Sequence, residues 1–199
     1  AGRMQPGSGL MVLRPFCAPH HSASVASLIG GGSNARPGEV SLAHNGVLFL
    51  DELPEFSRPA LEALRQPLED GIVSVTRVQN QAQYQASFMF IASMNPCPCG
   101  YYGSKTKKCR CSAHEIRRYL DRVSGPLLDR IDIQIEVDAV PVQEINQAAP
   151  AESSAQVRER VSKARKLQQE RYRQEGIHCN AQLDARLSKK YCELDAAST

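Results

Sequence analysis

The chain lacks several features that would assign it to a class at once. No apolar run in its 199 residues approaches the roughly 20 residues of a membrane-spanning helix, so we expect no membrane among its partners. The formal net charge of +3 is too small to imply a partner by itself. No Lys-Ser or Lys-Thr follows Gly30-Gly31-Gly32, so these glycines are not a Walker A phosphate loop. We expect them in a flexible surface loop.

The chain has seven cysteines, an odd number, so they cannot all be paired in disulfides within one chain. Four of them cluster in residues 97–111, a pattern that favours a reducing cytoplasm and a metal site. No signal peptide is visible, although residues 1–9 have the composition of a vector remnant or a truncated start. The expected location is therefore cytoplasmic.

An apolar run that ends in two carboxylates is the most informative motif. Residues 46–50 are uncharged and mostly apolar, as in a strand buried on both faces, and Asp51 and Glu52 follow directly. The carboxyl ends of strands line the ligand crevice of open α/β sheets. One acid there can hold Mg²⁺ while its neighbour polarises an attacking water. The alternative is a core strand that ends in a solvated acidic turn.

Periodicity and turn residues predict the other elements. They are a helix from Ser57 that kinks or ends near Pro67, hairpin strands at 72–78 and 82–87, a buried strand at 88–93, a basic helix at 112–123, a helical turn at 126–130, a half-buried strand at 131–137, and helices at 153–174 and 183–194. The long helix has a narrow apolar stripe, which we expect to be buried: Val157, Val161, Ala164 and Leu167. Residues 139–152 have the composition of a linker between residues 10–138 and 153–199.

Three features occur in a fixed order: the strand with Asp51 and Glu52, a strand that ends at Asn95, and Arg130 before another strand. Longer motifs surround them, namely Arg14-Pro15-Phe16, Ala18-Pro19-His20-His21-Ser22-Ala23-Ser24, Pro37-Gly38-Glu39-Val40-Ser41-Leu42-Ala43-His44, Phe49-Leu50-Asp51-Glu52-Leu53-Pro54-Glu55 and Ser124-Gly125-Pro126-Leu127-Leu128-Asp129-Arg130. Over about residues 12–195 the chain resembles AAA+ ATPases from the Walker B strand onward. Within them it resembles the magnesium-chelatase-like branch and its bacterial ComM/YifB competence-protein group.

The resemblance implies an α/β fold, a partial AAA+ P-loop NTPase core with a parallel sheet flanked by helices, a β-hairpin insert and the start of an α-helical lid. It also implies ATP and Mg²⁺ as cofactors. Asp51 would hold Mg²⁺, and Glu52 would orient and deprotonate the attacking water. Asn95 would be sensor 1, and Arg130 would be the arginine finger that reaches the next subunit's nucleotide. Such a finger requires self-association into a ring. The alternatives are a strand-end turn at Asn95 and an ion pair of Arg130 with Asp129 or Asp132.

The chain departs from the family pattern in two motifs. It contains no Gly-x-x-x-x-Gly-Lys-Ser/Thr loop, which supplies the backbone cradle and the lysine for the phosphates. The C-terminal sensor-2 arginine of the family is also missing. We therefore expect a piece of a larger ATPase. These 199 residues alone are predicted neither to bind ATP tightly nor to hydrolyse it.

Four cysteines form two C-x-C pairs separated by nine residues: Cys97, Cys99, Cys109 and Cys111. Four thiolates on one short loop can satisfy tetrahedral Zn²⁺, and a site here would brace the end of the strand at Asn95. C-x-C is tighter than the usual C-x₂-C, and His114 is a substitute ligand. The alternative is a set of free or oxidisable surface thiols.

The segment that follows Asn95 is locally basic, with tyrosines interleaved: Lys105, Lys107, Lys108, Arg110, Arg117 and Arg118. Basic side chains track a nucleic-acid backbone and aromatic rings stack on bases, whereas a solvated basic face is the plainer interpretation. The family resemblance favours DNA, single-stranded or branched. Members of the ComM group are implicated in branch migration as hexameric helicases in natural transformation.

Two other functions stay open at this point. One is a chelatase-type ATPase that remodels a metal-insertion complex, and the other is a non-catalytic, zinc-bearing DNA-binding module. His20 and His21 lack a third ligand at a useful spacing, so we expect them to cap backbone or to pack rather than to bind a metal.

Overall fold

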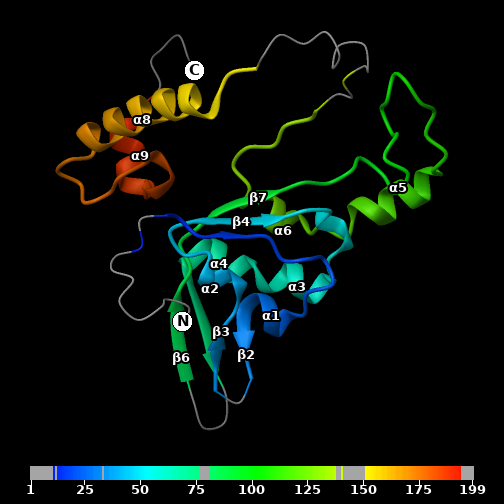
Figure 1. Ribbon diagram of the computed structural model, residues 1–199, viewed down its shortest axis with the longest axis horizontal. Helices are drawn as coiled ribbons and strands as arrows, with labels where there is room; N and C mark the ends of the chain where they lie inside the picture. Colours follow the sequence, from blue (N-terminus) through cyan, green and yellow to red (C-terminus); the bar gives the residue numbers. More distant parts are fainter. Residues whose placement is uncertain are drawn as a thin grey trace. The chain divides into compact units, whose positions relative to one another are not determined.

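The structure is a computed structural model that describes residues 11, 13–32, 34–76, 81–137, 140 and 151–193. The chain divides into two compact units, residues 1–139 and 140–199 (Figure 1). Among the described residues, no helix is both long and apolar enough to cross a membrane.

A three-stranded parallel sheet forms the centre of the first unit. Its order is β1 (Phe16–Cys17), β4 (Val47–Leu50) and β7 (Met89–Ala92), and Leu50 lies opposite Ala92. Because the strands are parallel, their carboxyl ends lie at the same edge of the sheet. The predicted α/β fold, a parallel sheet flanked by helices, is confirmed.

Short helices cover one face of this sheet (Figure 1). They are α1 (Val25–Ile29), α2 (Glu39–Leu42), α3 (Arg58–Ala63) and α4 (Arg65–Asp70). Leu127 of α6 (Gly125–Leu128) joins the same core. Leu48 and Leu50 of β4 are fully buried in the same core as these helices. Side chains alternate between the two faces of a strand, so these leucines share one face. Phe16 and Met89, by contrast, are 66% and 63% exposed.

The predicted helix after Ser57 forms as two pieces. The break lies at Leu64, and Pro67 explains it, because proline has no N–H to donate to the carbonyl four residues earlier. Ser57 occupies the N-cap position without a side-chain capping bond, and Gly71 ends α4 as expected.

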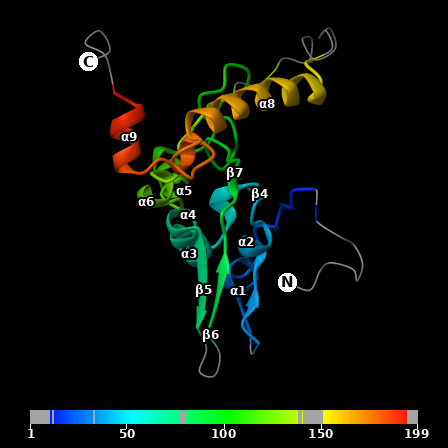
Figure 2. The same cartoon turned by 90° about the vertical axis from the view of Figure 1, so that its left-hand side faces the viewer.

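The predicted hairpin is confirmed as antiparallel strands β5 (Ile72–Thr76) and β6 (Gln81–Gln85), and residues 77–80 lie outside the described residues. Figure 2 shows it extending away from the three-stranded sheet, beside β2. The expected loop at the glycines is wrong for Gly30 and Gly31. They form β2, which pairs with β3 (Arg36–Pro37). A Cβ on Gly30 would lie 2.5 Å from the Arg36 carbonyl oxygen, so this close pairing requires glycine.

The predicted half-buried strand at 131–137 is wrong. These residues form no strand, and Ile133, Ile135 and Val137 are 79%, 80% and 79% exposed. Alternating apolar residues favour a strand only where another strand pairs with it. Within the described part of the chain, no strand pairs with this segment.

The second unit contains α8 (Ser154–Arg171), a 3₁₀ turn (Asn180–Gln182) and α9 (Ala185–Tyr191). Ser153 and Gln156 form the capping box that starts α8. Tyr172 and Leu187 are buried in the small core of this unit. The rings of Tyr172 and Tyr191 pack edge-on, with their centroids 5.2 Å apart.

The predicted burial of the apolar stripe on α8 is wrong for the described residues. The helix buries none of its side chains, and Val161 and Leu167 are 52% and 67% exposed. The core of this unit lies after the last turn of α8, so no described segment of the unit covers the stripe.

Candidate functional site

Asp51 lies directly after β4 and is fixed by the end of the neighbouring strand. The hydroxyl of Ser93, which follows β7, donates to Asp51 Oδ1, and the Glu52 amide donates to the same oxygen at 3.0 Å. The Leu53 amide donates to the Ser93 carbonyl at 2.9 Å. Two adjacent strand ends are thereby tied together, with Asp51 exposed between them. An exposed carboxylate held in this way suits a hydrated Mg²⁺ ion.

Glu52 adopts a left-handed backbone conformation, with φ 54° and ψ 49°. A side chain other than glycine rarely adopts this region, and such strain clusters at functional sites. The carboxylate Oε2 lies 3.1 Å from Nδ1 of His21, whose ring meets Phe56 edge-on at 6.4 Å. The packing predicted for His21 is therefore present, but its contact with Glu52 was not predicted.

Two residues of this site escaped the sequence prediction, Ser93 and His21. His21 comes shortly after β1, whose carboxyl end lies beside that of β4 in the parallel sheet. No local sequence pattern signalled this contact, because it depends on which strands are neighbours in the sheet, and strand ends that meet at one edge bring the following residues together. The backbone amide of Ser22 donates to Nδ1 of His20 at 3.3 Å, so the backbone-capping prediction is confirmed for this histidine.

Asn95 follows β7 at the same edge of the sheet as Asp51 and Glu52, and it is exposed. Its backbone amide donates to the hydroxyl of Tyr119, a buried residue of α5 (Ala113–Leu120). Burial raises the pKa of that tyrosine, with the nearby Glu55 carboxylate as the next cause. Gly100 lies near the Asn95 side chain, since a Cβ built on this glycine would be 3.9 Å from Oδ1. The backbone of Asn95 is therefore held by the helix, and its side chain faces the loop.

Arg130 lies after α6, in contact with α4 of the same chain. Its Nε donates to Glu69 Oε2 at 3.2 Å, and its Nη1 donates to the Pro126 carbonyl at 2.7 Å. The bond from Arg130 lowers the pKa of Glu69. Among the described contacts, the ion pair proposed as the alternative to a finger thus forms with Glu69 rather than with Asp129 or Asp132.

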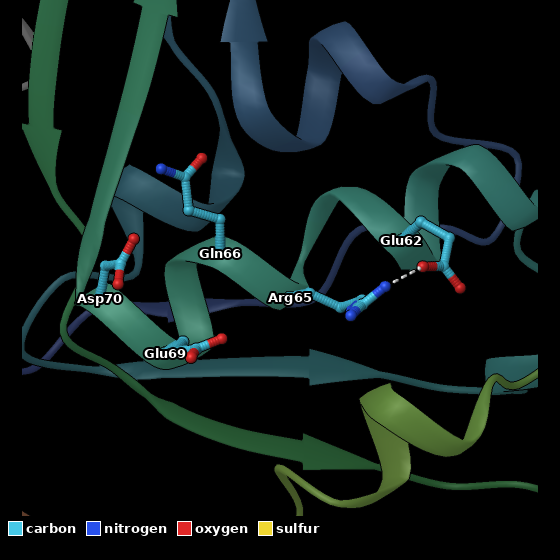
Figure 3. A pocket seen from close by; sticks show the side chains of 5 residues that line it. All are labelled: Glu62, Arg65, Gln66, Glu69 and Asp70. Atoms are coloured by element: carbon cyan, nitrogen blue, oxygen red, sulfur yellow. Dashed lines mark hydrogen bonds and ion pairs between the residues drawn. The ribbon is translucent and has the colours of Figure 1, made fainter.

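A shallow hollow of about 410 Å³ lies on the outer face of α3 and α4 (Figure 3). Charged and polar side chains line it: Glu62, Arg65, Gln66, Glu69 and Asp70. Arg65 donates to Glu62 at 2.9 Å, and Glu69 is paired with Arg130. Neither Asp51, Glu52 nor Asn95 lines this hollow, so it is separate from the residues predicted to bind the nucleotide.

The four clustered cysteines converge in space on the loop between β7 and α5. Their sulfur atoms all lie within 4.8 Å of one another, and Cys97 is buried. Backbone amides of Arg110 and Tyr101 donate to Cys99 and lower its pKa to about 6, whereas burial is the main cause that raises the pKa of Cys111 to about 12. His114 lies outside this cluster.

The predicted basic residues lie on two adjoining segments. Four belong to the cysteine loop and two to α5, and all are exposed: Lys105, Lys107, Lys108, Arg110, Arg117 and Arg118. Nζ of Lys107 lies 5.0 Å from the centre of the Tyr101 ring and donates to its hydroxyl at 3.3 Å. Ser112 and Glu115 form a capping box that starts α5 immediately after Cys111.

The chain matches two family models. Residues 2–145 match magnesium chelatase, subunit ChlI, and residues 151–199 match its C-terminal part. The chain belongs to the magnesium-chelatase-like ComM/YifB group of AAA+ ATPases. It is 49% identical over 183 residues to the competence protein ComM of Haemophilus influenzae, covering 92% of this chain and 35% of ComM. YifB of Salmonella typhimurium is 47% identical over 182 residues, covering 91% of this chain and 35% of YifB.

These comparisons confirm the family predicted from the motifs. The chain spans about a third of the length of these relatives, 35% in both cases. The group's use of ATP and Mg²⁺ fits the exposed acids at the strand ends. No comparison tests the roles of individual residues, which stay predictions.

Proposed function

We propose that this chain carries the water-activating half of the ATP site in a ring-forming DNA motor. The observation that carries the proposal is the fixed pair of acids at the end of β4. Asp51 is held by Ser93 and its own following amide, and Glu52 is held in a left-handed conformation beside His21. These contacts restrain both carboxylates, whereas an ordinary surface turn would leave them free to move.

The two acids have different tasks in this proposal. Asp51 binds the hydrated Mg²⁺ of Mg·ATP, and Glu52 takes the proton of the attacking water. Asn95, at the end of the adjacent strand, orients that water or the γ-phosphate. Arg130 leaves Glu69 and neutralises the charge that develops at a neighbouring subunit's phosphate.

These 199 residues lack the phosphate-binding half of the ATP site, because they contain no Walker A loop. The chain alone therefore binds Mg·ATP weakly and does not hydrolyse it. Calorimetry tests this directly, and micromolar binding of Mg·ATP to the isolated chain contradicts it.

DNA is the proposed substrate of the motor. Support comes from the six exposed basic residues on the cysteine loop and α5, and from the similarity to the competence protein ComM. Phosphate contacts by such residues make binding fall steeply with salt. Stimulation of the ATPase by DNA supports this substrate, and stimulation by a metal-insertion partner instead supports the chelatase alternative.

Glu52→Gln in the full-length protein tests the catalytic role. We expect the rate of ATP hydrolysis to fall about 10²–10⁴-fold, the range that a positioned general base contributes, while ATP binding persists. Glu55→Gln is the matched control, because Glu55 lies in the same turn but pairs with Arg122 at 2.9 Å. Equal losses in the two variants contradict a specific role for Glu52.

A further inference from the structure

We propose that Cys97, Cys99, Cys109 and Cys111 bind one Zn²⁺ ion, and that this ion folds the loop that carries the basic residues. The proposal does not depend on the ATPase function, because it rests on the loop's own residues. All four sulfur atoms lie within 4.8 Å of one another, although nine residues separate the two C-x-C pairs.

The distances among three of the sulfur atoms are close to the edges of a zinc tetrahedron. Cys97 Sγ lies 3.3 Å from Cys99 Sγ and 3.8 Å from Cys109 Sγ, and Cys99 lies 3.6 Å from Cys109. Zn–S bonds of about 2.3 Å in tetrahedral geometry require S···S edges of about 3.8 Å. A disulfide would need about 2.05 Å. The four thiols are therefore spaced for a shared ion rather than for pairwise oxidation.

Backbone amides of the loop point at the sulfur atoms. The Tyr102 amide donates to Cys97 Sγ at 3.3 Å, and the amides of Arg110 and Tyr101 donate to Cys99. Outer-shell donors of this kind orient thiolate ligands and disperse their charge. Gly100 and Gly103, both at φ 78°, supply left-handed positions where the loop turns back toward the cluster.

The chemistry of the donors selects the metal. Four thiolates with no carboxylate or imidazole among them favour zinc or iron over Mg²⁺ or Ca²⁺. The site is closed to substrate, since all four tetrahedral positions come from the protein and Cys97 is buried. The ion is therefore structural and not catalytic.

The ion would stabilise two neighbouring parts of the molecule, the basic segment of the loop and the segment beside Asn95. Lys105, Lys107, Lys108 and Arg110 lie between the first and last ligands, so closure of the loop fixes the spacing of these charges. Gly100, next to the ligand Cys99, lies near Asn95, since a Cβ built on this glycine would be 3.9 Å from Asn95 Oδ1. Loss of the ion would release both the basic loop and the segment beside Asn95.

The test begins with the intact chain, purified without a polyhistidine tag and without chelator. Elemental analysis should find one zinc per chain. Cys97→Ser and Cys109→Ser should each lose it, whereas Cys192→Ser, at an exposed cysteine outside the cluster, should retain it. Chelation should speed trypsin cleavage after Lys105, Lys107, Lys108 and Arg110 about tenfold, because these exposed residues are cut only when the backbone around them opens locally to fit the protease. Cleavage in α8 serves as the internal reference.

Cobalt substitution of the unmutated chain keeps the test decisive if the serine variants do not fold. Absorption bands of tetrahedral cobalt thiolate should appear and should vanish when zinc is added. Absence of bound metal, iron in place of zinc, or disulfides among these four cysteines in the unreduced chain would each overturn the proposal.

Discussion

The cysteine loop and the carboxylate site differ in how far apart in the sequence their residues lie. All four cysteines fall within residues 97–111, so one turn-rich loop brings them together. The carboxylate site draws on the ends of β1, β4 and β7, and the contact between Ser93 and Asp51 spans 42 positions. A local site needs only its loop to close, whereas a site between strands needs the whole sheet.

The two sites also differ in the donors that the chain supplies. The loop provides four ligands, a full set for tetrahedral zinc. In the proposed function the carboxylate site provides groups for a metal ion and a water, while the sequence contains no phosphate-binding loop. We therefore expect the loop to bind its ligand in the isolated chain and the carboxylate site to need further segments.

Leu50→Ala should separate the two sites most strongly. Leu50 is fully buried directly before Asp51, so truncation should lower the free energy of unfolding by about 2–5 kcal/mol, measured by urea titration. Below the unfolding transition, zinc content should not change, because no cysteine ligand lies on β4. Leu167→Ala, at a residue 67% exposed, should change stability by less than about 0.5 kcal/mol. Loss of zinc from folded Leu50→Ala would show that the loop depends on the sheet.

Sequence patterns correctly predicted the elements whose formation depends on neighbouring residues in the sequence. The run at 46–50 gave the strand before Asp51, and Ser112 started the basic helix as expected. The contact between His21 and Glu52 was missed because it depends on which strands are neighbours, which no local pattern encodes. The same limit explains the error at 131–137, where the apolar alternation is present but no described strand pairs with it.

His21→Gln tests the long-range contact in the carboxylate site. We expect kcat for ATP hydrolysis by the full-length protein to fall about two- to fivefold with KM unchanged, the effect of losing one exposed contact that orients Glu52. His20→Gln is the matched control, because the ring centre of His20 lies 4.0 Å from that of His21 at a tilt of 38°, but His20 accepts from Ser22 and does not contact Glu52 among the described contacts. A change in KM alone, or equal effects from both variants, would argue against an orienting role.

Glu69→Gln should have the smallest effect, because the Arg130–Glu69 contact joins distant segments yet lies at the surface. Arg130 lowers the pKa of Glu69, so the ionised carboxylate is favoured in the fold. The contribution is present above the pKa of the unfolded chain and is lost as the pH falls through the folded pKa. NMR of the Arg130 Nε–H group should show an acid transition in the unmutated chain that Glu69→Gln abolishes.

Asp70→Asn removes the adjacent charge on α4 and should leave that transition in place. An exposed pair contributes little to stability, so the urea midpoint at neutral pH should shift far less in Glu69→Gln than in Leu50→Ala. A persistent transition in Glu69→Gln would assign the titration to another acid. A transition that requires Glu69 means that Arg130 starts from a bound state, and the arginine finger of the proposed function would have to break this contact before it could reach a neighbouring subunit. Weak, salt-screened pairing is what such a release requires.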